Sequence, residues 1–238
     1  MPFHNQDCTG EAEIVLAQVT DRRFQLRKGF CYRRESRTFV VTPDDLPDTD
    51  LATVPFALRW FASGYGRHTL AALLHDYLLE FGPGLDPTVN RVEADLFFRQ
   101  AMADLRVPLV RRWLMWAGVT LGTRIKATSL ASRIGVVLWI LLATVGSVTF
   151  GVALATADVA LGALAAVGPI LFAVLWGRQA FAAVVAGYGV LIVGIPTVAV
   201  LAGWSVYWVA EQLVNGLRKA KKANREVELP GPTPYGEL

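Results

Sequence analysis

One histidine and three aspartates in the first half of the sequence have the residue types and the spacing needed for hydrolytic chemistry. His75 and Asp76 are adjacent within the apolar stretch AALLHDYLLE, residues 71–80, and Asp50 and Asp95 lie before and after that stretch. On a helix, adjacent side chains point about 100° apart, so His75 and Asp76 must serve different partners. Burying such groups unpaired is costly, which indicates that each has a partner.

Asp95 is the predicted partner of His75. The apolar spacing over residues 67–81 predicts a helix, the turn residues 82–87 are expected to end it, and a second helix is predicted over residues 88–105. A connection this short makes the two helices antiparallel neighbours, which lets Asp95 lie opposite His75. A carboxylate on one imidazole nitrogen fixes the tautomer and makes the other nitrogen a better base.

Asp76 is then left to face a cation together with Asp50, which lies in the loop TPDDLPDTD. Each residue taken alone also has a plainer interpretation. His75 would be a hydrogen-bonded core histidine, and Asp50 a turn or helix-cap residue. Asp95 would form an exposed ion pair with Arg91, four positions earlier on the same helix.

The elements around these residues predict an α+β fold. Residues 11–42 alternate short apolar and polar runs around a basic turn at residues 33–37, which is typical of a small antiparallel sheet. A third helix is expected from Pro108 to about Gly122. Residues 1–130 are long enough to bury a modest core, so we predict one soluble domain there.

The second half of the sequence has the composition of a transmembrane region. Residues 134–210 contain only Asp158 and Arg178 as charged side chains, in a chain that is 53% hydrophobic. A membrane-spanning helix needs roughly 20 apolar residues. Three runs approach or exceed that length, and they cover residues 134–157, 159–176 and 180–210.

The third run contains Pro196 and is longer than one upright span requires, so it is either one tilted, kinked helix or a broken, partly re-entrant element. We predict a transmembrane region over residues 134–212 and a basic, proline-containing tail over residues 213–238. Self-association through the membrane helices is a further expectation. No feature indicates a nucleic-acid partner.

The distribution of basic residues barely distinguishes the two possible orientations of the protein in the membrane. For three spans, four basic residues lie on the side of the first domain and five on the other; these are Arg124, Lys126, Arg133 and Arg178 against Arg218, Lys219, Lys221, Lys222 and Arg225. No signal peptide is visible, which favours a cytoplasmic N-terminal domain on the inner membrane. Cys8 and Cys31 have neither a disulfide framework nor metal-ligand spacing, so packed thiols are expected.

Four short motifs together resemble a phage and bacterial family known as domain of unknown function 1353, whose pattern runs TDxASVP, then HDYLY, then a helix with AD. The motifs are TDLATVP at 49–55, HDYLL at 75–79, ADLFFRQAM at 94–102 and MWAGVTLG at 115–122. More remotely, their order is similar to that of the bacterial secreted phospholipase A2 enzymes. Those have an Asp-Leu pair in a calcium loop, an HD pair on a long helix and an aspartate on the antiparallel helix.

The resemblance to phospholipase A2 implies a role for each residue. His75 would be the general base that activates water, and Asp95 its orienting partner. Asp50 and Asp76 would be calcium ligands together with the carbonyl oxygen of Leu51. Calcium accepts carboxylate and carbonyl oxygens, and it would hold the ester and stabilise the oxyanion.

The sequence departs from that pattern at Leu79, where the resembling enzymes have a tyrosine whose hydroxyl supports the aspartate. This sequence also lacks the disulfide framework that braces those enzymes. Calcium, moreover, is scarce in the cytosol, where we expect the domain. We expect a membrane-anchored, phospholipase A2-like hydrolase that acts on lipid esters. The alternatives are a non-catalytic phage or prophage-type structural or lysis accessory protein, and a metal-dependent hydrolase with another substrate.

Overall fold

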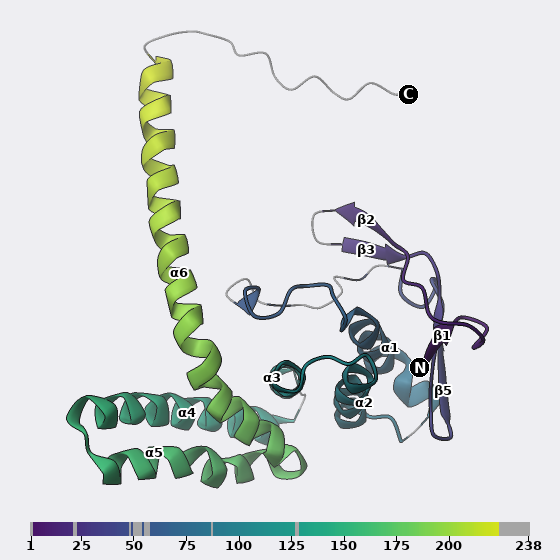
Figure 1. The fold of residues 1–238 in the computed structure, drawn as a ribbon, viewed down its shortest axis with the longest axis horizontal. Helices are drawn as coiled ribbons and strands as arrows, with labels where there is room; N and C mark the ends of the chain where they lie inside the picture. Colours follow the sequence, from purple (N-terminus) through teal and green to yellow (C-terminus); the bar gives the residue numbers. More distant parts are fainter. Residues whose placement is uncertain are drawn as a thin grey trace. The chain divides into compact units, whose positions relative to one another are not determined.

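The computed structural model describes residues 2–20, 23–47, 49, 54, 58–86, 88–126 and 129–223. The chain divides into two compact units, Met1–Ile195 and Pro196–Leu238. Antiparallel strands come first, three helices follow, and long apolar helices end the described chain, so the predicted α+β fold is confirmed (Figure 1). The predicted domain boundaries at residues 130 and 212 stay predictions.

The strands form two small antiparallel sheets. The first has the order β1-β4-β5, from β1 (Phe3–Asn5), β4 (Phe30–Arg34) and β5 (Arg37–Val41). The second is a hairpin of β2 (Leu16–Thr20) and β3 (Arg23–Leu26). The predicted turn between β4 and β5 is confirmed. The turn is tight, and Glu35 adopts a left-handed backbone conformation in it, with a φ of 55°.

Cys8 and Cys31 are joined by a disulfide bond, so the expectation of two packed thiols was wrong. Cys31 is fully buried in the central strand β4, where it pairs with His4 of β1. The bridge therefore ties the turn after β1 to the middle of the sheet. Sequence spacing gave no sign of this pairing, because the strands bring together two residues that are 23 positions apart.

Helix α1 (Thr69–Leu85) carries His75 and is longer than predicted. It does not end at Gly82 but continues through Pro83, and the backbone N–H of Asp86 still donates to the Gly82 carbonyl, 2.9 Å away. Proline removes the bond that its own N–H would have made and crowds the carbonyl four residues earlier, and the helix ends two residues after it, at Leu85. Gly82 has a packing role, because a Cβ there would lie 2.8 Å from the Val89 Cγ1 atom.

Helix α2 (Arg91–Asp104) runs back along α1 and carries Asp95. Its start is fixed by Asn90, whose side-chain oxygen accepts hydrogen bonds from the backbone N–H groups of Val92 and Glu93, at 2.9 and 3.2 Å. Helix α3 (Leu109–Ile125) follows directly after Pro108. Both helices lie within three residues of their predicted limits.

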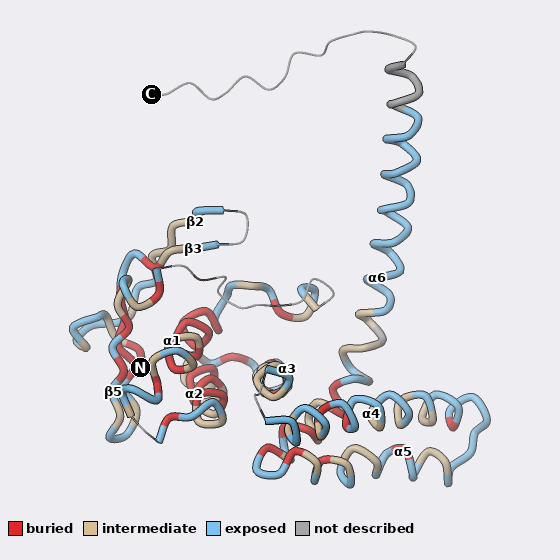
Figure 2. Tube along the Cα trace, turned by 180° about the vertical axis from the view of Figure 1, so that it is seen from behind, coloured by how far each residue is buried: buried red, intermediate tan, exposed pale blue. Residues whose placement is uncertain are grey.

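The core of the first unit lies between the β1-β4-β5 sheet and helices α1 and α2, which are the most continuously buried elements (Figure 2). Phe39 of β5 packs edge-on against Phe97 of α2, with ring centroids 5.2 Å apart. The same cluster of buried residues includes Trp176 and Ala182 from the apolar second half of the sequence. The core therefore joins residues from both halves of the sequence.

Three helices are long and apolar enough to cross a membrane, at Leu130–Thr156, Val159–Val190 and Ile192–Leu217. The first is α4 (Leu130–Thr156), and α5 (Val159–Phe172) packs beside it. A 3-10 segment, η2 (Ala173–Gln179), then leads to α6 (Ala180–Ala223), with a kink at Gly177. Helix α6 continues through Pro196, so the alternative of a broken third element was wrong. These helices are those of a membrane-associated protein.

Candidate active site

His75 and Asp95 meet in the buried space between α1 and α2. The His75 Nε2 atom lies 2.9 Å from the Asp95 Oδ1 atom, and the two side chains are 9% and 1% exposed. The Phe98 ring packs against the imidazole, with centroids 5.3 Å apart. The predicted pairing is therefore confirmed. The alternative of an exposed ion pair between Asp95 and Arg91 was wrong, because Asp95 is buried.

Asp95 accepts two further hydrogen bonds that the sequence did not reveal. Thr123 of α3 donates its hydroxyl to Asp95 Oδ1 at 3.0 Å, and Gln179 of η2 donates its amide to Oδ2 at 3.3 Å. These donors lie 28 and 84 positions away in sequence. Neither residue belongs to a motif, so only the tertiary fold could identify them.

Arg124 holds Gln179 from the other side. Its Nη1 atom donates to Gln179 Oε1 at 2.7 Å and to the Trp176 carbonyl at 3.2 Å, and the guanidinium lies 5.3 Å from the centre of the Trp176 ring. Burial lowers the pKa of Arg124 below its usual value. The η2 segment is thereby anchored to α3 beside the His75–Asp95 pair.

The second imidazole nitrogen points away from Asp95. His75 Nδ1 lies 3.9 Å from Asp76 Oδ1, which is too far for a hydrogen bond. Within the described part of the chain, Nδ1 has no hydrogen-bond partner, so its lone pair is available to a water molecule or a substrate. Asp76 is 38% exposed, which places an accessible carboxylate next to the available nitrogen.

The predicted calcium ligands are only partly described. Asp76 lies beside His75, whereas Asp50 and Leu51 fall outside the described residues. Thr49, which precedes Asp50 in sequence, exchanges backbone hydrogen bonds with Phe24 at 2.8 and 2.9 Å, and its hydroxyl lies 3.5 Å from Asp76 Oδ2. Among the residues that the structure describes, no group of three or more His, Cys, Asp or Glu side chains could hold a metal ion.

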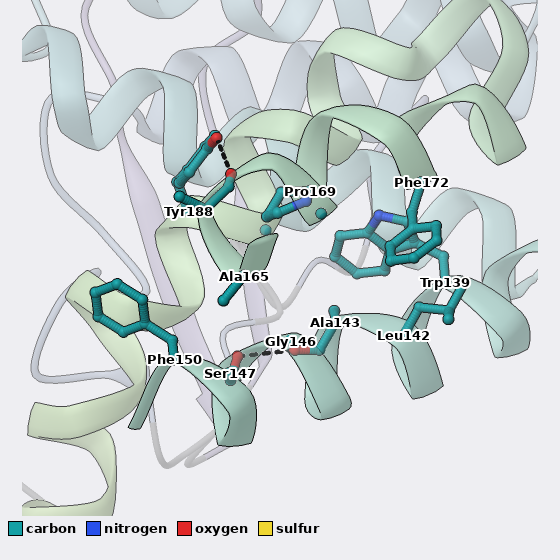
Figure 3. Close-up of a pocket in the computed structure, with 13 residues that line it drawn as sticks. Trp139, Leu142, Ala143, Gly146, Ser147, Phe150, Ala165, Pro169, Phe172 and Tyr188 are labelled. Carbon is teal, nitrogen blue, oxygen red and sulfur yellow. Dashed lines mark hydrogen bonds between the residues drawn. The ribbon is translucent and has the colours of Figure 1, made fainter. Parts of the chain in front are cut away.

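A separate cavity of about 250 Å³ lies among α4, α5 and the start of α6 (Figure 3). Its walls include Trp139, Phe150 and Phe172. The hydroxyl groups of Ser147 and Tyr188 donate to the carbonyls of Ala143 and Ala166, so both are already satisfied. Among the described residues that line the cavity, none forms an acid–base pair.

Comparison with protein families gave one match. Residues 24–119 match the model of a family described as "Protein of unknown function (DUF1353)". The matched segment runs from β3 into α3, and it contains every site residue predicted from the sequence. Thr123, Arg124 and Gln179 lie outside it. Neither a curated protein nor a solved structure matched the chain.

Proposed function

We propose, from the site within the residues that match the DUF1353 model, that this protein is a membrane-anchored hydrolase of lipid esters. The observation that best supports this proposal is the buried 2.9 Å contact between His75 Nε2 and Asp95 Oδ1. The other imidazole nitrogen, Nδ1, has no hydrogen-bond partner among the described residues. This arrangement supports general-base catalysis, because the carboxylate holds one tautomer and stabilises the imidazolium that forms.

The proposed reaction begins when Nδ1 of His75 takes a proton from a water molecule. The water oxygen attacks the ester carbonyl carbon, and the carbonyl oxygen becomes an oxyanion. The carbon–oxygen bond to the alcohol then breaks, and the imidazolium returns its proton to the departing oxygen. The products are a carboxylic acid, which ionises, and an alcohol, while His75 returns to its neutral form.

Calcium is the proposed cofactor. The exposed carboxylate of Asp76 is the kind of hard oxygen donor that calcium prefers, and it lies next to the reacting nitrogen. Asp50 and the Leu51 carbonyl are the proposed additional ligands. A bound calcium ion would supply positive charge for the developing oxyanion.

Lipid is the proposed substrate class because the site is joined to helices of membrane-spanning length. Gln179, which contacts Asp95, lies within the candidate span Val159–Val190. In the second unit, the described residues from Pro196 to Leu217 are all intermediate or exposed, and this largely apolar surface suits lipid or a second copy of the chain. We propose an inner-membrane location.

For the N-terminal domain, we propose the side of the membrane that faces an oxidising compartment. A disulfide such as Cys8–Cys31 persists there and is rare in the cytosol. This orientation also places the five basic residues after the last span on the cytoplasmic side, and it supplies calcium. The disulfide thus favours this side over the cytoplasmic one predicted from the sequence.

Labelling tests the orientation. Asp44→Cys introduces an exposed thiol into a protein whose own two cysteines are joined in a disulfide. A thiol reagent that does not cross the cytoplasmic membrane should label this variant in intact cells. Labelling only after lysis would restore the cytoplasmic assignment.

Hydrolysis is tested with the purified protein, calcium and phospholipid vesicles, by measuring the release of fatty acid. His75→Gln should lower the rate by at least about 10²-fold, because glutamine cannot take the proton. His68→Gln is the matched control: His68 is also buried, at the start of α1, but it bonds to the Ser63 carbonyl. Folded wild-type protein that releases no fatty acid would refute the proposal.

A non-catalytic role is the second candidate, and the burial of Asp95 favours it. A carboxylate with three hydrogen-bond donors could serve only to hold α1, α2, α3 and η2 together. In that case the protein would be a membrane structural or lysis accessory component of phage type. A metal-dependent hydrolase with another ester or amide substrate would use the same residues, and a panel of such substrates would identify it.

A further inference from the structure

The carboxylate of Asp95 depends on protein donors because it is fully buried. An ionised carboxylate only accepts hydrogen bonds, and leaving an acceptor unpaired away from water is costly. Oδ1 accepts from His75 and Thr123, whereas Oδ2 accepts from Gln179. In the described residues Gln179 is therefore the sole donor to one of the two carboxylate oxygens.

The amide of Gln179 is suited to this place by its chemistry. Arg124 can only donate hydrogen bonds and Asp95 can only accept them, so a side chain between the two must accept at one end and donate at the other. Gln179 does both, because Oε1 accepts from Arg124 at 2.7 Å and Nε2 donates to Asp95 at 3.3 Å. The guanidinium thereby fixes which end of the amide faces the carboxylate.

We propose that Gln179 is a positioning residue for the His75–Asp95 pair, so that the segment between α5 and α6 completes the site from the membrane region. Its importance for hydrolysis rests on the proposed function above. Its effect on the geometry of His75 does not.

Gln179 acts by holding the plane of the carboxylate. With Oδ2 tied to Gln179, the carboxylate resists rotation, and Oδ1 stays directed at His75 Nε2. The imidazole then keeps its proton on Nε2 and its lone pair on Nδ1, which is the form that a general base needs. The anchor is rigid because Arg124 also binds the carbonyls of Trp176 and Leu175 within η2.

The test uses the full-length protein with ¹⁵N-labelled histidine in lipid nanodiscs. The imidazole nitrogen shifts report the tautomer of His75, and exchange of its Nε2 proton with water reports how firmly the hydrogen bond is held. Gln179→Leu should populate the second tautomer, accelerate this exchange about tenfold, and lower hydrolysis about 10- to 100-fold, the range typical of groups that orient a metal-ligating histidine or carboxylate.

Variants at two positions of α3 provide the controls. Thr120→Val removes a buried hydroxyl that has no hydrogen-bond partner among the described residues, one turn before Arg124, and it should leave both the tautomer and the exchange rate unchanged. Thr123→Val should loosen the Nε2 proton, and Thr123→Ser should restore it, because serine keeps the hydroxyl. If Gln179→Leu does not fold, Gln179→Asn replaces it, since an amide shorter by one methylene cannot reach both partners.

The outcomes separate this inference from the proposed function. An unchanged tautomer and unchanged exchange in a folded Gln179 variant would overturn the positioning role, even if hydrolysis is present in the wild type. Conversely, wild-type protein without hydrolysis but with the expected loss of the single tautomer in Gln179→Leu would refute the enzyme and keep the positioning role.

Discussion

Helix α2 carries two aspartates, Asp104 and Asp95. Each carboxylate accepts three hydrogen bonds from side chains, yet the side chains that donate them differ in kind. Asp104 accepts from the Tyr32 hydroxyl at 2.9 Å and from Arg34 Nη1 at 2.9 and 3.0 Å. Asp95 accepts from His75, Thr123 and Gln179, and the described chain gives it no arginine or lysine.

The difference lies in whether the partner's charge can change. Arginine remains charged at any physiological pH, so Asp104 and Arg34 form a permanent ion pair that ties β4 to α2. An imidazole can accept and return a proton during a reaction, so the His75–Asp95 pair can change its charge state. Arg124 does not contact Asp95 directly, because the side chain of Gln179 lies between them and bonds to both. The comparison therefore assigns a bracing role to Asp104, whereas Asp95 is paired with a side chain that can take up a proton.

Asp95→Asn should break the comparison most strongly. The amide cannot fix the imidazole as a carboxylate does, so we expect fatty-acid release to fall by at least about 10²-fold. Asp104→Asn is the matched control on the same helix, and its rate per folded molecule should stay within about twofold of the wild type. Equal losses in both variants would mean that Asp95 is only another brace.

Asp104→Asn should lower the stability of the protein rather than its activity. The substitution removes the charge that pairs with Arg34 and weakens the bond from Tyr32, so we expect the free energy of unfolding to fall by about 1–3 kcal/mol. Denaturation of the detergent-solubilised protein measures this loss. No change in stability would show that the ion pair is a surface contact of little energetic value.

Gly82→Ala tests whether the approach of α1 to α2 matters more to the His75–Asp95 pair than to the Asp104 brace. A methyl group 2.8 Å from the Val89 Cγ1 atom must displace Val89, in the connection that leads into α2, at a cost of about 1–3 kcal/mol. The His75 Nε2 proton should then exchange faster with water. Gly84→Ala is the control, because no atom lies within 4 Å of its Cβ and the substitution should be neutral or stabilising.

The smallest effect concerns pH. Burial, and then the hydrogen bond to Asp104, raise the pKa of Tyr32 well above the usual 10.0. A raised folded-state pKa means that the contribution to stability is complete below pH 10.0 and is lost as the pH rises above that value. Between about pH 9 and pH 10.5 we expect a loss of about 1 kcal/mol that Tyr32→Phe lacks. Parallel pH curves for the two proteins would contradict this.

Local sequence patterns were sufficient to predict the His75–Asp95 pair, because both residues lie on helices that are close together in the sequence. The apolar spacing of α1 and the short connection to α2 were sufficient to place Asp95 opposite His75. The end of α1 was missed because Gly82 and Pro83 signal a turn in isolation, whereas here Gly82 serves the packing against Val89.

The remaining partners of Asp95 were missed for a different reason. Gln179 lies next to an apolar run that hydropathy assigns to lipid, and nothing in that pattern shows that its amide reaches a carboxylate 84 positions earlier. The disulfide was missed likewise, because Cys8 and Cys31 meet only once β1 and β4 have paired. The roles of Asp50 and Leu51 stay predictions.

The three bonds to Asp95 also imply an order of assembly during synthesis. Their donors lie 20, 28 and 84 positions from Asp95, all but His75 towards the C-terminus, and closing a loop costs more entropy as it lengthens. A chain made from its N-terminus can therefore join α1 to α2 first and add α3 next. It cannot engage Gln179 until α4 and α5 have been made. A ribosome-bound intermediate that ends before η2 would hold its histidine more loosely than the finished protein, which delays full function until the membrane region exists.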